Sequence, residues 1–224
     1  MLKKVIFALI ILLLAAGGAG LYFYQKKQSA NQSSQTSTTA ITPSTTSNQT
    51  TTTTPTPTPQ SQFALPVANY KTGQTKKPFG IYITPATSPV QPERFTGYHT
   101  GVDVEQIQDN TDVPVYAIYN GTVCYVNYVS GYGGVIVIEF SHQNQTYTAL
   151  YGHIRLASAT VKMGDNVTKS EQLAVLGTGY STETDNERKH LHFSIHEGSS
   201  VVLAGYVQNQ SELSAWIDPD SIIN

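Results

Sequence analysis

The sequence predicts an all-β domain, either an antiparallel β-sandwich or a barrel-like sheet of about eight or more strands. Three observations lead to this fold class and to the order of segments along the chain. Short runs rich in Val, Ile, Tyr and Thr alternate with Gly-rich or polar turns over the C-terminal part of the chain. An uncharged apolar segment stands near the N-terminus, and a long Ser/Thr/Gln/Pro-rich stretch separates it from the β-like runs. The predicted domain therefore follows a transmembrane helix and a disordered linker.

The N-terminal segment, residues 1–27, is predicted to be a membrane anchor. Its stretch VIFALIILLLAAGGAGLYFY, residues 5–24, has 20 residues without a charge and lies between two pairs of lysines. As a helix it would span roughly 30 Å, the thickness of the hydrocarbon core. A cleaved signal peptide is the alternative, since AAGGAG contains small residues that suit cleavage. The lysine pairs on both sides do not fix the orientation, but the position at the N-terminus favours a C-terminal domain outside the cytoplasm, single-pass at the membrane or, after cleavage, secreted.

Residues 28–62 form the predicted linker. They contain no charged residue and end in TTTTPTPTPQSQ. Such a composition buries too little apolar area to offset the entropy of ordering. The Pro-Thr repeat favours an extended stalk, which at roughly 3 Å per residue could reach on the order of 100 Å. A stalk of this kind holds a domain away from the membrane.

The predicted domain occupies residues 63–224. No segment within it shows a convincing amphipathic helical period. Its β-like runs are GIYIT, VPVYAIY, GTVCYVNYV, GGVIVIEF, TYTALYGHI, QLAVLG and HLHFSIH, with SGYGG and SHQNQ as turns. The Tyr content suits pleated surfaces and also a groove that binds a polymer.

Charge and cysteine content exclude some classes of protein. From residue 63 onward there are 9 Lys and Arg residues against 15 Asp and Glu residues, a net charge of −6. This balance leaves no basic stripe, so we expect no nucleic-acid binding. Cys124 is the only cysteine, which excludes an intrachain disulfide, and its β-like surroundings predict a buried, inert thiol.

The stretch HLHFSIH provides the first candidate site. In a strand, residues 190, 192, 194 and 196 face one side, while the apolar Leu, Phe and Ile between them face the core. His190 and His192 therefore point together from one sheet face, on a rigid backbone that suits zinc ligation. An H-x-H pair alone is weak evidence for a metal.

Two further pieces carry histidines. In GYHTGVDVE, an extended chain would place His99 and Asp103 on one face, with Gly101 leaving room above them. In LYGHIRL, His153 follows a β-like run and a glycine. His142, in SHQNQ, is interpreted as a turn residue without a function, and His196 as a residue at the rim of the site.

The ordered motifs HTGVD, YGHI and HLH resemble the lysostaphin-type, or LytM-type, zinc endopeptidases, a family of peptidoglycan hydrolases that includes Gly-Gly endopeptidases. The likeness extends over roughly residues 79–220, through VPVYAIYNGTV, GYGGVIVIEF and VKMGDNVTKSEQLAVLGTG. It implies one Zn²⁺ per chain held by His99, Asp103 and His192. It also implies that His153 and His190 are the catalytic histidines beside it. Three protein ligands are typical of a catalytic zinc.

By this resemblance the chain is a membrane-tethered zinc metalloendopeptidase that hydrolyses the peptide cross-links of peptidoglycan in wall remodelling. The sequence departs from the family in TDNERK before HLH, in Ser194 and in Ser170, and these departures bear on the substrate subsites. A non-catalytic wall-binding or hydrolase-activating module of the same fold is the main alternative. A cupin-like metal site and a purely structural β-domain are weaker ones. Two pairs of alternatives stay open here: the domain acts alone or with an activating protein, and residues 63–96 either pack along the groove or cover it.

Overall fold

The computed structural model describes residues 62–73, 75–106 and 111–223. The predicted membrane helix, and the predicted linker up to residue 61, lie outside the described residues. Within the described ranges, no helix has both the length and the apolar character needed to cross a membrane.

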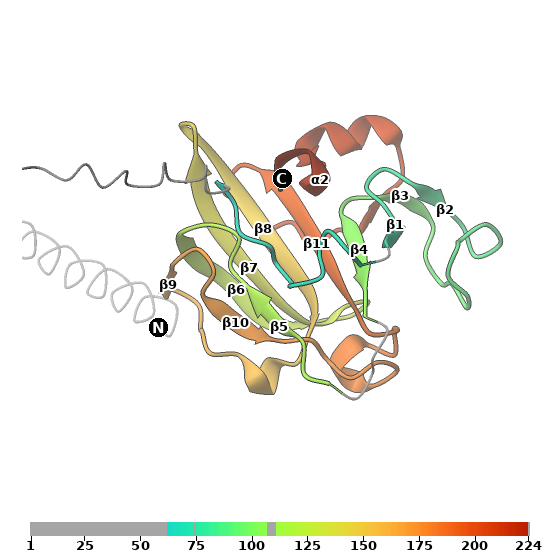
Figure 1. The fold of residues 1–224 in the computed structure, drawn as a ribbon. Helices are drawn as coiled ribbons and strands as arrows, with labels where there is room; N and C mark the ends of the chain where they lie inside the picture. Colours follow the sequence, from blue (N-terminus) through green and yellow to red (C-terminus); the bar gives the residue numbers. More distant parts are fainter. Residues whose placement is uncertain (1–61, 74, 107–110, 224) are drawn as a thin grey trace, which may run out of the picture. The chain divides into compact units, whose positions relative to one another are not determined.

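Antiparallel pairing dominates the fold, as the sequence predicted (Figure 1). The main sheet has eight strands, in the order β1 (Thr75–Lys77), β4 (Val102–Glu105), β11 (His190–Glu197), β8 (Gln145–Ile154), β7 (Gly133–His142), β6 (Gly121–Val129) and β9 (Asn166–Val167), with β13 (Trp216–Ile217) also paired to β11. Two smaller sheets contain β5 (Pro114–Tyr116) with β10 (Gln172–Val175), and β2 (Tyr82–Ile83), β3 (Gly97–His99) and β12 (Tyr206–Val207). The short helical segments are η1 (Leu156–Ser158), η2 (Thr182–Thr184), η3 (Gln210–Ala215) and α2 (Pro219–Ile222).

The larger hydrophobic core lies on one face of the main sheet. It collects alternate residues of the long strands, among them Ile136, Tyr151 and Phe193, and packs them against the β5–β10 sheet. Chain residues 63–70 cover the same core through Phe63, Val67 and Tyr70. Complete burial of side chains of this size is typically worth about 1.5–3 kcal/mol each.

The opposite face of the sheet carries a smaller apolar cluster of Tyr132, Val135, Val137 and Leu150. Leu150 pairs with Ser194 on β11, so the residues two positions away along β11 face the same side. His190 and His192 therefore project from this face, while Leu191, Phe193 and Ile195 enter the larger core. The alternation predicted for HLHFSIH is confirmed.

Gly101 has a different role from the one predicted. Residues 97–105 do not form one extended strand, because β3 ends at His99 in one sheet and β4 begins at Val102 in another. A Cβ atom on Gly101 would lie 2.3 Å from the carbonyl oxygen of Phe193. The glycine is therefore required by the close approach of this turn to β11 and does not make room above the ligands.

His153 reaches the site face through a β-bulge. On β7, Gly134 pairs with Ile154 and the next residue, Val135, pairs with Gly152, which leaves His153 as the extra residue of β8. His153 has a φ of 61°, in the left-handed region that non-glycine residues rarely adopt. Tyr151 and Ile154 stay in the larger core on either side. The bulge thus turns one histidine out of the alternation without disturbing its neighbours.

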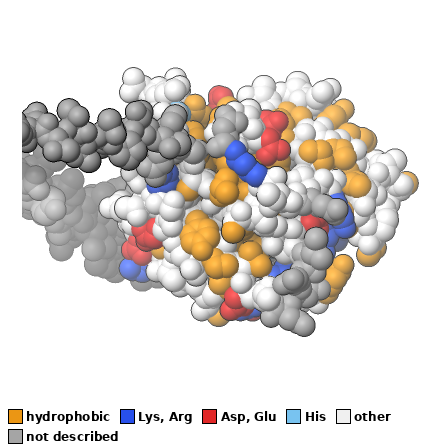
Figure 2. All heavy atoms as spheres, viewed as in Figure 1, with side chains coloured by type: hydrophobic (Ala, Val, Ile, Leu, Met, Phe, Trp, Pro, Cys, Tyr) orange, Lys and Arg blue, Asp and Glu red, His pale blue; other side chains and the backbone are white. Residues whose placement is uncertain are grey.

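The charged side chains are dispersed over the surface in Figure 2. Lys and Arg side chains on that face lie apart from one another, among acidic and uncharged groups. The described residues on this face therefore show no basic stripe.

Candidate metal centre

Three atoms from three buried side chains form a close triangle. His99 Nε2 lies 3.0 Å from His192 Nδ1 and 3.2 Å from Asp103 Oδ1, and His192 Nδ1 lies 3.1 Å from the same Asp103 oxygen. All three residues are nearly inaccessible to solvent. Each comes from a different strand: β3, β4 and β11. The three predicted ligands are therefore brought together.

The neighbouring hydrogen bonds orient two of these donors. His99 Nδ1 lies 3.2 Å from the carbonyl oxygen of Pro78, to which an N–H must donate, so Nε2 carries the lone pair. His192 Nε2 faces the hydroxyl of Tyr132 at 3.4 Å, which leaves Nδ1 toward the triangle. Both imidazoles can thus present an unprotonated nitrogen beside a carboxylate oxygen.

This donor set fits a zinc ion. Tetrahedral zinc with ligand bonds of about 2.0–2.1 Å places neighbouring ligand atoms roughly 3.3 Å apart, close to the separations seen here. Two imidazole nitrogens and one carboxylate oxygen are a typical three-ligand set that leaves one position open. His99, Asp103 and His192 together could hold a metal ion.

His153 and His190 stand beside the triangle. Their ring centroids are 4.1 Å apart, and His190 Nε2 lies 3.4 Å from Asp103 Oδ2. His190 Nδ1 donates to the carbonyl oxygen of Arg188 at 2.9 Å, which leaves Nε2 free of that proton. His153 Nδ1 is buried and has no hydrogen-bond partner among the described residues. Both rings therefore offer nitrogens for proton transfer or hydrogen bonding.

Burial and neighbouring charges determine the protonation of these groups. Burial lowers the pKa of His192 to about 4. Burial, together with the nearby His190, holds the pKa of His153 well below its usual value. Burial acts to raise the pKa of Asp103, but His190 and His99 outweigh it and hold that pKa well below the usual range. At neutral pH the site therefore contains neutral His153 and His192 and an ionised Asp103.

Arg188, which the sequence interpretation did not select, contacts the outer oxygen of Asp103. Its Nη2 donates to Asp103 Oδ2 at 2.9 Å and to Glu105 Oε1 at 2.6 Å. Its Nε adds bonds of 2.9 Å to both oxygens of Glu105. The signal was present in TDNERK, a charged segment immediately before HLH.

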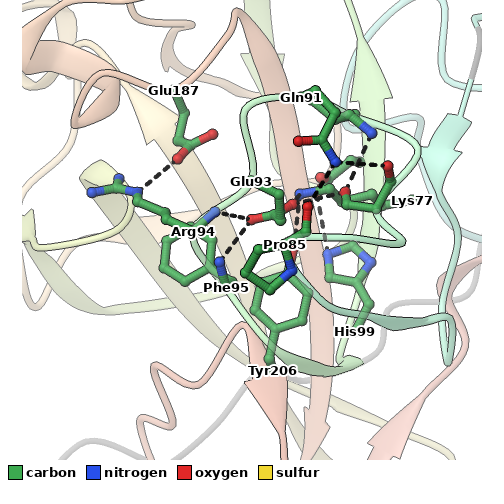
Figure 3. Close-up of polar contacts among 12 residues, drawn as sticks. Lys77, Pro85, Gln91, Glu93, Arg94, Phe95, His99, Glu187 and Tyr206 are labelled. Atoms are coloured by element: carbon green, nitrogen blue, oxygen red, sulfur yellow. Dashed lines mark hydrogen bonds and ion pairs between the residues drawn. The ribbon is translucent and has the colours of Figure 1, made fainter.

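A cavity of about 310 Å³ opens onto the site. Its lining includes His153, His190 and His192, together with the aromatic residues Phe95, Tyr132 and Tyr206. Lys77 enters from β1 and is almost fully buried, where it forms an ion pair with Glu93 and donates to Tyr206 Oη at 3.1 Å. Figure 3 shows Glu93 also accepting from the backbone N–H groups of Arg94 and Phe95. Residues from the segment 63–96 therefore line the wall of the cavity.

A second polar cluster connects three chain segments beside the cavity and consists of Arg94, Tyr128, Gly131 and Asp185. In this Asp185 cluster, the carboxylate accepts from the hydroxyl of Tyr128 and the backbone N–H of Gly131, both at 2.6 Å, and from Arg94 Nη2 at 2.9 Å. Arg94 also donates to Glu187 at 2.9 Å, an interaction visible in Figure 3. Gly131 and Glu187 line the cavity. The cluster therefore helps to set the shape of the cavity's edge.

Three other residues that the sequence analysis interpreted lie outside the cavity. His142 lies at the end of β7 and packs against Phe63 and Tyr119, away from the cavity. His196 packs edge-on against Trp216 and does not line the cavity, contrary to its predicted place at the rim. Cys124 is half-buried rather than fully buried, and its thiol donates to the carbonyl oxygen of Val137 at 3.4 Å.

Comparison with known proteins finds a family match and a relative, each over part of the chain. Residues 97–204 match peptidase family M23. The endolysin 2638A of Staphylococcus phage 2638A is 33% identical over 100 residues, a match that spans 44% of this chain and 19% of the endolysin's length.

Solved structures with similarity to this chain include the following two. The structure of cbpa from L. salivarius REN has 20% identity and a TM-score of 0.52, covering 72% of this chain and 94% of that chain. A zinc containing peptidase from Vibrio cholerae has 26% identity and a TM-score of 0.42, covering 56% of this chain and 33% of that chain. The likeness to cbpa supports the antiparallel fold.

Replacing Asp185 by Asn tests the Asp185 cluster. The hydrogen bond from Tyr128 is the first cause that lowers the pKa of Asp185, so the ionised form stabilises the folded state. We expect Asp185→Asn to lower the free energy of unfolding at pH 7 by about 1.5–3 kcal/mol, since hydrogen bonds to a charged group are worth about that much. Chemical denaturation of the purified protein measures it.

The effect of Asp185→Asn on the free energy of unfolding should depend on pH. Because the folded-state pKa of Asp185 is depressed, its contribution is present above the unfolded value of about 3.9 and is lost as pH falls through the folded-state pKa. The difference between wild type and Asp185→Asn should therefore shrink in acid. Asp165→Asn, at an exposed turn, is the control and should cost less. Equal losses in both variants would contradict the role of the cluster.

Proposed function

We propose that this chain, which carries a peptidase family M23 domain, is a zinc-dependent endopeptidase that cleaves the peptide cross-links of peptidoglycan. The family comprises zinc metallopeptidases. The observation that carries the proposal is the triangle of His99, Asp103 and His192, with His153 and His190 beside it. Similarity to a protein named as an endolysin supports the substrate class.

In the proposed reaction, the metal ion and the histidines of the protein have different roles. A zinc ion bound by the three ligands would polarise a substrate carbonyl and lower the pKa of a water molecule toward neutrality. His190, whose Nε2 faces the site, accepts a proton from the attacking water and returns it to the leaving amine as the C–N bond breaks. His153, kept neutral by burial, donates an N–H to the oxygen on which negative charge develops. The aromatic side chains of the cavity wall offer apolar surface to a bound peptide beside these groups.

The first prediction of this proposal concerns metal content. The purified protein should contain one zinc ion per chain, and His99→Ala or Asp103→Ala should release it, because each removes one of three protein ligands. Elemental analysis after gel filtration measures the ratio. His142→Ala, at the end of β7 away from the cavity, is the matched control and should keep the metal. Full zinc content in both ligand variants would refute the assignment.

The second prediction separates catalysis from ligation. His153→Ala and His190→Ala should each keep the fold and the zinc ion, because neither nitrogen belongs to the triangle of donors. Each should lose at least about a hundredfold in the rate of cleavage of cross-linked peptides, the usual effect of removing a positioned acid–base group or oxyanion donor. Mass spectrometry of the products from purified peptidoglycan identifies the bond that is cut, and circular dichroism checks folding.

The same experiment distinguishes an enzyme from a wall-binding module of the same fold. A binding module predicts no chelator-sensitive cleavage by the wild type and unchanged wall binding in both variants. A third result would exchange the roles of ligand and catalytic histidine between His192 and His190. Loss of zinc in His190→Ala with retention in His192→Ala would show that His190 is the ligand. The structure favours His192, whose Nδ1 is the atom that meets both other donors.

We further propose that the domain acts outside the cytoplasm on a membrane tether. The uncharged segment Val5–Tyr24, bracketed by lysine pairs, supports an anchor, and residues 28–62 support a stalk that reaches toward an extended polymer. Full-length protein should therefore stay in the membrane fraction in high salt and be released by detergent. Recovery of mature protein in the medium, with its N-terminus near residues 20–30, would replace the anchor with a signal peptide.

A further inference from the structure

We propose that Arg188 is a positioning residue for the metal centre: its guanidinium engages the outer oxygen of Asp103 so that only Oδ1 is offered to the ion, and its carbonyl orients His190. The proposal rests on the metal dependence proposed above. It concerns a residue that lies outside the ligand triangle and beside it.

The guanidinium is nearly buried and bonds to two carboxylates through Nε and Nη2. The side chain of Arg188 is 8% exposed and that of Asp103 is 2% exposed. Arg188 Nη2 donates to Asp103 Oδ2 at 2.9 Å, whereas Asp103 Oδ1 lies within 3.2 Å of His99 Nε2 and His192 Nδ1. The two oxygens of one carboxylate are thus divided, one toward the ligand nitrogens and one toward a fixed cation.

The register of the sheet explains why a cation is needed here. On β4, Asp103 and Glu105 are two residues apart and face the same side, and they pair with His192 and His190 of β11. Two buried carboxylates side by side repel each other and are costly to desolvate. Arg188, two residues before His190, contacts both, and its planar fork matches this arrangement in a way that a lysine cannot.

The backbone of Arg188 acts on the second histidine. Its carbonyl oxygen accepts the Nδ1–H of His190 at 2.9 Å, which directs Nε2 of that ring to the site. The bonds of the guanidinium to Asp103 and Glu105 limit the movement of the same residue. One residue therefore couples the orientation of a proposed ligand, through its side chain, to that of a neighbouring histidine, through its backbone.

Loss of the guanidinium should free Asp103 to rotate and to offer both oxygens to the ion. Groups that hydrogen-bond to metal ligands typically contribute about 10–100-fold to metal affinity or activity. We expect Arg188→Gln to weaken zinc binding by a factor in that range. In the cobalt-substituted protein, the visible absorption should weaken, because the intensity falls as the coordination number rises.

If Arg188 had only a structural role, its loss would lower stability without a specific effect on zinc affinity. Glu105→Gln is the matched variant that distinguishes a structural role from a positioning role. It breaks the same buried ion pair but leaves the bond between Arg188 and Asp103 intact. Both variants should lower the stability of the metal-free protein. Only Arg188→Gln should change zinc affinity beyond a few-fold and alter the cobalt spectrum.

The experiment uses the full chain and three readouts: zinc affinity by competition with a chromophoric chelator, the cobalt spectrum, and denaturation of the metal-free protein. Arg188→Lys keeps the charge but lacks the fork, so it should fold and still lose zinc affinity at least several-fold. This variant keeps the test decisive if Arg188→Gln does not fold.

Zinc affinity and a cobalt spectrum equal to wild type in Arg188→Lys, or equal losses of affinity in Arg188→Gln and Glu105→Gln, would overturn the proposal. Absence of zinc binding by the wild type would instead refute the proposed function. The failures of the two proposals are therefore distinguishable.

Discussion

The pairing of β4 with β11 is the constraint on which the site depends. It sets Asp103 opposite His192 and Glu105 opposite His190, so one ladder carries two predicted ligands, a predicted catalytic histidine and the carboxylate that binds Arg188. A slip of one residue would send both histidines of β11 into the larger core and bring Leu191 and Phe193 to the site face. The complete burial of Leu191, Phe193 and Ile195 fixes this register, since the opposite one would place imidazoles among apolar side chains. Packing on one face of the sheet thus determines chemistry on the other.

The remaining groups reach the site by departing from regular strand geometry. His153 arrives through the bulge of β8, and His99 through the turn at Gly101 that moves the chain from one sheet to another. Gly152 precedes the bulge, and a Cβ there would lie 2.6 Å from the ring of Tyr132, which itself packs against His192. Both irregular positions carry a glycine at the point of closest approach. Local strain and close backbone contacts are therefore concentrated around the site, where the surrounding strands hold them in place.

These features explain what the sequence could and could not predict. Alternation in HLHFSIH and the Val/Ile/Tyr-rich runs gave the antiparallel strands and the common face of His190 and His192, because strand periodicity is local information. The bulge at His153 and the role of Gly101 depend on the positions of β7 and β11, which no local pattern encodes. Arg188 was overlooked because a charged segment before a strand normally lies in solvent, and only the fold shows two carboxylates beneath it. The convergence of His99, Asp103 and His192 was predicted only through the likeness to a family, since their separation in sequence spans 94 residues, from 99 to 192 inclusive.

The buried polar groups around the site hold the proposed ligand side chains in place. A buried charge without a partner is strongly destabilising, so Asp103, Glu105 and Arg188 hold one another, and Lys77 and Glu93 form a second buried pair along the cavity wall. Tyr206 links this second pair to the ligands, because it accepts from Lys77 and its ring lies 5.1 Å from that of His99. These contacts fix the ligand side chains through bonds that do not involve an ion. The donor atoms are consequently held at the spacing that the proposed metal site requires.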